Sequence, residues 1–252
     1  MTSPIDQSVP GTSIHYNDQI LHSTLTHQNS ADIFKLVKAL SQFRPRLFSQ
    51  KALDIGLITA CKIRNPLIVQ GLLHNGANLE TRDERGMTPL LLCAELSMSE
   101  LAKILLQRGA NVNAISFYGE TPLIVSTYLP GSAAMAKLLL EHPQVDLRHQ
   151  NNNGYSALMS AIEAHNISVV KLLINADTLG TTDDLQEPQV NNDGETVEEI
   201  AQRVGVADLL KLIRDEKRTG VRSLHQALLN RDIKSVQILT NCNDGVQDNK
   251  LT

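Results

Sequence analysis

The 252-residue chain has no tryptophan, and its only aromatic side chains are four phenylalanines and four tyrosines. A core with so few rings must be filled mainly by Leu, Ile, Val and Ala, which suits closely packed helices. The three cysteines include no C-x-x-C pair, which argues against a disulfide framework and favours a reducing compartment. We therefore expect the protein to be cytoplasmic or otherwise intracellular.

No apolar run approaches the roughly 18 residues that a membrane-spanning helix needs. The polar start, MTSPIDQSVPGTS, is unlike a secretory signal, which needs an apolar stretch. A net charge of −4 gives the chain no general attraction to nucleic acid. These absences predict neither membrane insertion nor nucleic-acid binding.

Motifs for catalysis are also missing. The sequence contains no G-x-S-x-G, no P-loop, no H-E-x-x-H and no dinucleotide fingerprint. Its eight histidines are scattered, and none pairs with Cys, Asp or Glu at metal-ligand spacing. We expect no enzyme activity, no cofactor and no metal site.

One stretch, 86–114, reads as a compact pair of helices. Thr88 can cap the first helix and Pro89 suits its first turn. Small or apolar residues follow, Cys93 among them, as Cys61 does one repeat earlier, and we expect both cysteines to be buried and inert. The second helix has an apolar face formed by Leu101, Ile104 and Leu105. Gly109 then ends this helix in a left-handed conformation.

Copies of this unit follow at intervals close to 33 residues. Gly119 begins GETPLIVS, 33 residues after Gly86 begins GMTPLLLC, and weaker copies begin at Gly154 and Gly194. A short helix pair cannot bury its apolar faces alone, so it needs copies beside it. Period and motif resemble the ankyrin repeat, with its Gly-x-Thr-Pro-Leu-His opening and Gly-Ala-x-Val-Asn exit. The resemblance implies an all-α ankyrin-repeat solenoid of about five helix-pair repeats, with short hairpin loops and irregular N- and C-terminal caps.

The sequence departs from the ankyrin pattern in several places. Leu91, Ile124 and Met159 stand where the family has its histidine, so any hydrogen bonds of that histidine are missing. Repeat three has two extra residues, one near Pro130 and Gly131 and one in EHPQVD. Two possibilities stay open for the long acidic insertion before the last repeat: an arm that closes on a partner, or a passive disordered loop.

These features predict the following organisation. A flexible segment, 1–19, precedes a repeat domain, 20–241, and a polar tail, 242–252, follows it. The domain begins with a cap at 20–49, in which Asp32 begins the second helix, and ends with a cap at 223–241. The repeats are expected at 50–82, 83–115, 116–150 and 151–176, followed by the acidic insertion at 177–190 and a degenerate repeat at 191–213.

In ankyrin proteins the hairpin tips and the inner face of the first helices contact partners. Carried over by position, the resemblance implies a partner-binding set of Glu84, Arg85, Met87, Glu95, Phe117, Tyr118, Glu120, Tyr128, Leu129, Asn152, Asn153, Tyr155 and Glu163. The aromatic members, Phe117, Tyr118, Tyr128 and Tyr155, could form the centre of an interface. Alternatively, Tyr128 and Tyr155 pack between repeats and fix their spacing.

The function that follows is non-catalytic protein binding, as an adaptor, scaffold or inhibitor, and we expect the chain to be a monomer on its own. A second hypothesis is a microbial effector that engages host proteins in the host cytosol, since the tail ending in Lys250, Leu251 and Thr252 is compatible with an export signal. A remote third is an enzyme with its site in the loops 41–50 and 177–190.

Overall fold

The computed structural model describes residues 13–27, 36, 38, 40, 48–129, 131–176, 189–211 and 214. The chain divides into two compact units, residues 1–117 (unit 1) and 118–252 (unit 2), each taken by itself below. Among the described residues the regular structure is helical, and β-type pairing is limited to isolated bridges. The all-α prediction is therefore confirmed.

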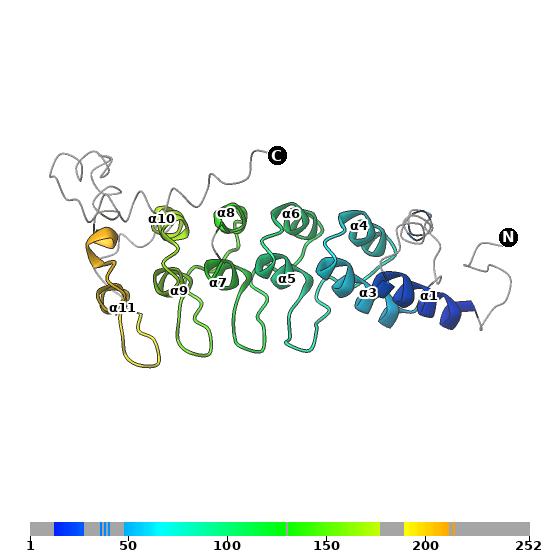
Figure 1. The fold of residues 1–252 in the computed structure, drawn as a ribbon, viewed down its shortest axis with the longest axis horizontal. Helices are drawn as coiled ribbons and strands as arrows, with labels where there is room; N and C mark the ends of the chain where they lie inside the picture. The colour runs from blue at the N-terminus through cyan, green and yellow to red at the C-terminus, as the bar shows by residue number, and fades with distance from the viewer. Residues whose placement is uncertain are drawn as a thin grey trace. The chain divides into compact units, whose positions relative to one another are not determined.

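Unit 1 contains two helix pairs behind an N-terminal helix (Figure 1). The N-terminal helix α1 is Ser13–His27. The first pair is α3, Gln50–Lys62, with α4, Pro66–His74. The second pair is α5, Pro89–Glu95, with α6, Ser99–Gln107.

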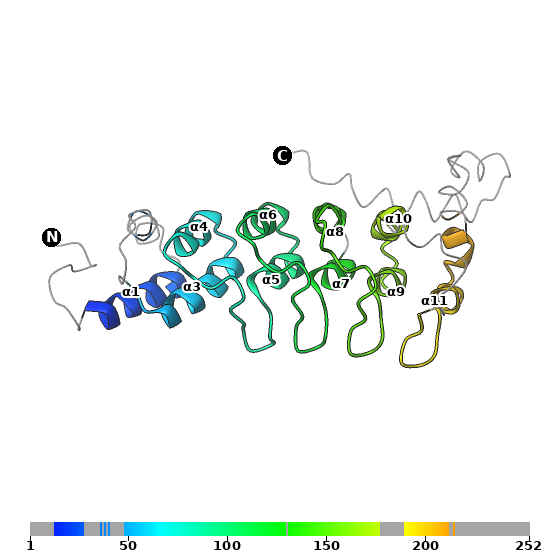
Figure 2. The same cartoon turned by 180° about the vertical axis from the view of Figure 1, so that it is seen from behind.

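Unit 2 repeats the arrangement. Its pairs are α7, Pro122–Thr127, with α8, Ala133–Leu140, and α9, Ala157–Glu163, with α10, Ile167–Ala176. Helix α11, Val197–Arg203, begins a further copy. Within unit 2, the first helices α7, α9 and α11 lie in one row with hairpin loops extending beyond them, and α8 and α10 lie in a second row (Figures 1 and 2). We call the first helices of a unit, with their hairpins, its hairpin side.

The first helices begin where the sequence predicts. The hydroxyl oxygens of Thr88, Thr121 and Ser156 each accept a hydrogen bond from a backbone N–H in the first turn of the helix that follows. At α11, Thr196 and Glu199 form a reciprocal capping box. These caps satisfy amide hydrogens that would otherwise have no partner at a helix start.

Apolar residues replace the family's histidine inside the core. Leu91, Ile124 and Met159 are all at most 1% exposed, so packing has taken the place of the polar contacts of that histidine. Cys61 and Cys93 are also fully buried, as predicted. The neighbouring Cys61 thiol and burial both raise the pKa of the Cys93 thiol, which disfavours the reactive thiolate.

Each turn between paired helices contains one left-handed residue. These residues are Arg64, Ser97, Gly131 and His165, with φ between 53° and 81°. Gly131 takes this place beside the predicted insertion, and His165 takes it at the turn where the sequence places it. The turn geometry is therefore conserved between repeats although the residue type is not.

The N-terminal cap differs from the prediction. Helix α1 begins at Ser13, inside the segment 1–19 that was expected to be flexible, so that boundary is wrong. The reason is packing: Leu21 and Leu25 are 1% and 2% exposed, and α1 contacts α3. Gly56 allows the close approach, since a Cβ atom there would lie 3.4 Å from Leu21.

Helix α3 also starts earlier than the repeat pattern suggests. Its N-cap is Ser49, six positions before Ile55, which aligns with the capping Thr88. The second cap helix expected after Asp32, most of the insertion 177–190, the cap 223–241 and the tail 242–252 lie outside the described residues.

Candidate functional site

A short polar side chain closes the hairpins, three residues before the glycine. In unit 1, Asp83 Oδ1 accepts hydrogen bonds from the backbone N–H groups of Arg85 (2.9 Å) and Met87 (3.0 Å). In unit 2, Asn151 and Asn191 each make the same two bonds. Sequence analysis missed these residues, although an Asp or Asn recurring three positions before a glycine was a readable signal.

Asp83 is the ionisable member of this set. Burial acts to raise its pKa, but hydrogen bonds from the Met87 and Arg85 amides, together with Lys62, outweigh burial and lower the pKa below its usual value. The Lys62 ammonium lies 3.2 Å from Asp83 Oδ2. The charged form of Asp83 therefore stabilises the hairpin.

The predicted binding residues of unit 1 have different environments. Glu84 is exposed at the hairpin tip. Arg85 donates to both oxygens of Glu95, at 2.6 Å and 2.7 Å, so these two residues already form a bidentate ion pair. Met87 is only 3% exposed, and its prediction as a surface residue is wrong. It directly precedes the capping Thr88, a position from which an apolar side chain turns onto the helix.

Phe117 is both exposed and structurally engaged. Its side chain is 66% exposed, and its backbone N–H donates to the Arg85 carbonyl at 3.1 Å. Its ring lies over Gly86, where a Cβ atom would come within 2.6 Å of the ring. Phe117 therefore connects two successive hairpins as well as presenting an aromatic face.

In unit 2 a chain of polar contacts crosses the hairpin side. Asn151 Nδ2 donates to the Tyr128 hydroxyl at 3.5 Å. Asn151 and Tyr155 also exchange backbone contacts across their hairpin. The Tyr155 hydroxyl then accepts from Arg203 at 3.4 Å. The contacts connect residues from three successive repeats.

Tyr128 lies at one end of this chain. Burial of its hydroxyl end and the Glu120 carboxylate raise the pKa of Tyr128 to about 12, although the residue as a whole is 45% exposed. Close to this hydroxyl, the Ser160 Oγ is buried and has no hydrogen-bond partner among the described residues. A buried hydroxyl without a partner costs about 1–3 kcal/mol.

Arg203 lies at the other end. It donates to both oxygens of Glu163, at 3.1 Å and 2.8 Å, and to both oxygens of Glu195, at 2.9 Å and 3.1 Å. Glu163 and Glu195 raise the pKa of Arg203, which holds it in the charged form. The network thus ties α9 to α11 on the hairpin side of unit 2. Sequence analysis named Glu163 but missed Arg203, 40 residues away.

The family comparison bears on this architecture. The family model for ankyrin repeats (3 copies) matches residues 57–150 and 118–186, which together cover just over half of the chain. The chain belongs to the ankyrin repeat family. Ankyrin repeats are generally protein–protein interaction modules and are typically non-catalytic. No curated protein matches the chain in the comparison of sequences.

The ankyrin hairpin tips of unit 2 hold the remaining predicted residues. Tyr118 is 60% exposed, and Asn152 and Asn153 are exposed as well. The Asn152 amide donates to the Tyr118 carbonyl at 3.0 Å, so the tips are tied to one another. Leu129 is half-buried, and its carbonyl accepts from Asn166 Nδ2 at 2.9 Å. These residues share the hairpin side of unit 2, whereas Phe117 and the residues before it belong to unit 1.

In the described part of the ankyrin chain, no group of three or more His, Cys, Asp or Glu side chains could hold a metal ion. None of the helices described there is long and apolar enough to cross a membrane.

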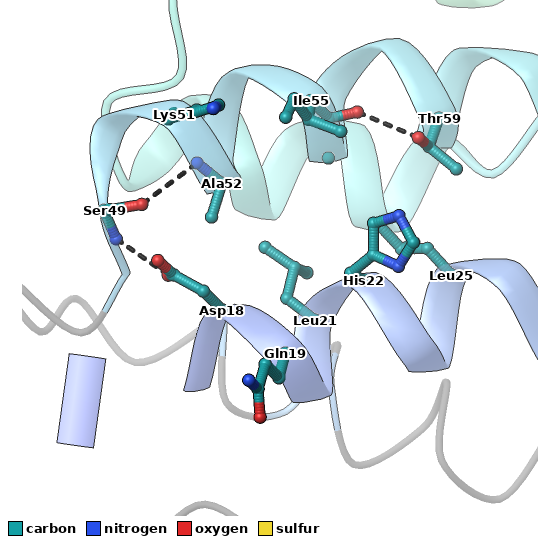
Figure 3. Close-up of a pocket in the computed structure, with 11 residues that line it drawn as sticks. Asp18, Gln19, Leu21, His22, Leu25, Ser49, Lys51, Ala52, Ile55 and Thr59 are labelled. Carbon is teal, nitrogen blue, oxygen red and sulfur yellow. Dashed lines mark hydrogen bonds between the residues drawn. The ribbon is translucent and has the colours of Figure 1, made fainter. Parts of the chain in front are cut away.

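A groove that sequence analysis did not predict lies between α1 and α3 (Figure 3). It has a volume of about 820 Å³, and Leu21, Leu25 and Ile55 form its apolar wall. At one end, Asp18 Oδ1 accepts from the Ser49 backbone N–H at 2.9 Å. The groove was missed because it depends on α1, whose start was placed too late.

Proposed function

We propose that this ankyrin repeat chain is a non-catalytic protein-binding module, acting as an adaptor, scaffold or inhibitor. The observation that carries the proposal is the presence of exposed aromatic side chains on a hairpin side that internal hydrogen bonds hold in place. Tyr118 and Tyr128 are 60% and 45% exposed in unit 2, and Phe117 is 66% exposed in unit 1. Aromatic side chains often dominate the binding energy of interfaces.

Preorganisation supports the same proposal. Binding is weakened by the entropy lost when interface side chains become ordered. The Arg85–Glu95 pair and the Arg203 network already hold charged side chains in place before a partner arrives. An interface on these surfaces would bury roughly 1,200 to 2,000 Å² in total.

The proposed binding set keeps every predicted residue except Met87, which is buried. Phe117 has a second role on Gly86, so its removal would disturb the hairpin as well as a binding surface. A sharper test therefore uses the tyrosines of unit 2.

Affinity purification with mass spectrometry should compare the full wild-type chain with a Tyr118→Ala/Tyr128→Ala variant, after circular dichroism has shown that both are folded. The matched control is Leu67→Ala, because Leu67 is 60% exposed but lies on the second helix α4. We expect a partner that is retained by wild type and the control and lost by the tyrosine variant. Retention by the tyrosine variant would exclude these residues from the interface.

The finer assignments remain proposals. We propose a monomeric, intracellular protein without enzyme activity, and light scattering coupled to size-exclusion chromatography would test the monomer. The effector hypothesis rests on the tail, which lies outside the described residues. A translocation reporter with and without the last twenty residues tests it: transfer only with the tail would support it, and no transfer in either form would remove it.

A further inference from the structure

The two units differ in charge on their hairpin sides. In unit 2 the segments 118–128, 143–163 and 189–203 contain seven carboxylates and two arginines, a net charge of −5. The corresponding segments of unit 1, 49–63, 76–95 and 110–117, contain five carboxylates against four Lys or Arg, a net charge of −1. The hairpin side of unit 2 is therefore acidic, and that of unit 1 is nearly balanced.

Internal pairing does not remove this excess. At its centre one guanidinium, that of Arg203, faces two carboxylates, those of Glu163 and Glu195. Asp193 and Glu198 are also exposed on this side, and Arg214 pairs with Glu198 alone. A net negative potential remains on the surface.

The tyrosines add a second kind of attraction for cations. The face of a tyrosine ring attracts Lys and Arg groups that stack on it. Tyr128 is 45% exposed beside the Glu120 carboxylate. The Arg203 guanidinium already contacts the Tyr155 hydroxyl between two carboxylates, which shows that a guanidinium fits this chemistry.

Ser160 provides an observation independent of charge. It is 1% exposed, and its Oγ, close to the Tyr128 hydroxyl, has no partner within the described chain. A hydroxyl group that lacks a hydrogen bond at the edge of an exposed aromatic site is available to a group brought by a ligand.

From these features we infer that the hairpin side of unit 2 binds a basic segment of a partner protein, with Arg or Lys side chains reaching Tyr128 and the surrounding carboxylates. This inference rests on the proposed function and names the chemistry of its partner. Nucleic acid and anionic lipid are disfavoured, because the same negative potential repels their phosphates.

The test uses two fluorescein-labelled peptides of equal length, one of repeated Arg-Gly-Ser triplets and one of repeated Glu-Gly-Ser triplets. Fluorescence anisotropy with the full wild-type chain should show binding of the arginine peptide only, weakening as salt is raised. Equal binding of both peptides, or no binding of the arginine peptide at low salt, would overturn the inference.

The site variant is Glu120→Gln/Asp193→Asn/Glu198→Gln, which removes three negative charges from the hairpin side of unit 2. We expect it to weaken binding of the arginine peptide by about tenfold or more. Circular dichroism checks that this variant is folded.

The control is Glu100→Gln/Glu141→Gln/Asp208→Asn, three exposed carboxylates outside the hairpin sides. It changes the net charge equally, and we expect less than about a twofold effect on binding. An equal loss in both variants would mean that total charge, not this surface, attracts the peptide. If the arginine peptide fails while a protein partner is still lost by the tyrosine variant, the proposed function stands and only the basic-segment inference falls.

Discussion

The hairpins of the two units are joined by the same backbone contact and by different side chains. In unit 1 the Phe117 amide donates to the Arg85 carbonyl at 3.1 Å. In unit 2 the Asn152 amide donates to the Tyr118 carbonyl at 3.0 Å, and Asn192 repeats the contact with the hairpin before it. Each donor stands two residues before the glycine of its own hairpin.

The side chains at this shared position cover the preceding glycine differently. The exposed Phe117 ring lies on Gly86, whereas at Gly154 the nearest atom is the backbone nitrogen of Asn192. Asn192 Nδ2 also donates to the Asn152 carbonyl at 2.9 Å. The comparison teaches that the backbone contact sets the repeat, while the side chain decides whether the joint is an aromatic surface or a polar clasp.

The largest expected effect separates a joint that yields from one that does not. Gly154 has φ of +77°, and an added Cβ would lie 2.6 Å from backbone, so Gly154→Ala should lower the free energy of unfolding by about 3 kcal/mol. Gly86→Ala should lose about 2 kcal/mol, because the exposed Phe117 ring can turn away. Urea denaturation followed by circular dichroism measures both.

The control for this pair is Gly109→Ala. Gly109 has φ of +92° and no described atom within 4 Å of an added Cβ, so only the conformational cost of about 1 kcal/mol should appear. Equal losses at all three glycines would contradict the difference between the joints.

The next effect concerns the hairpin clasp. Asn191 is 4% exposed, and its Oδ1 accepts from the Asp193 and Glu195 amides at 3.0 Å and 2.8 Å. Asn191→Ala should cost about 1–2 kcal/mol, because these amides lose their partner. Asn153→Ala, at an exposed position whose backbone alone makes the hairpin contacts, should cost less than about 0.5 kcal/mol in the same denaturation experiment.

A smaller effect depends on pH and distinguishes the units at one equivalent position. The pKa of Asp83 is lower folded than unfolded, so its stabilisation is full above about pH 4 and is lost as the pH falls through the folded-state pKa. Asn151 makes the same bonds in unit 2 and does not titrate. Hydrogen-exchange protection of the Met87 amide should therefore fall on acidification, and that of the Tyr155 amide should be steadier.

The matched variant is Asp83→Asn, which keeps the hydrogen-bonding oxygen and removes the titration. Protection of the Met87 amide should then stay nearly constant over the same pH range. If it still falls as in wild type, other carboxylates, and not Asp83, control this hairpin in acid.

The smallest expected effect comes from exchanging one joint for the other. Phe117→Asn keeps the backbone contact and replaces the ring with the side chain used in unit 2, so stability should change by less than about 1 kcal/mol. Thermal denaturation measures this change. A loss well above that range would mean that the ring on Gly86 is a main support of unit 1.

Much of the fold was readable from the sequence because its signals are local and repeated. The caps at Thr88 and Thr121 were predicted from a hydroxyl residue before proline, and both are present. The glycine positions followed from the 33-residue interval, and Gly86 and Gly154 both have positive φ. Such features need only neighbouring residues to be satisfied, so one repeat predicts the next.

The surface was only partly readable. The exposure of Tyr118, Tyr128 and Phe117 agrees with their predicted positions, whereas Met87, from the same reasoning, is buried. The same hairpin position holds Glu120 and Tyr155 in later repeats, so the repeat pattern alone did not separate a binding residue from an apolar staple.

The sequence by itself thus determined the period, the caps, the left-handed glycines and the apolar replacement of the family's histidine, because each is decided within a few residues or by the repeat. Only the tertiary structure decided that Arg203 joins Tyr155 and Glu163, residues 48 and 40 positions away, and that α1 begins at Ser13 against α3. Contacts of this kind depend on which side chains the stacked elements bring together, and no local pattern in the chain encodes that choice.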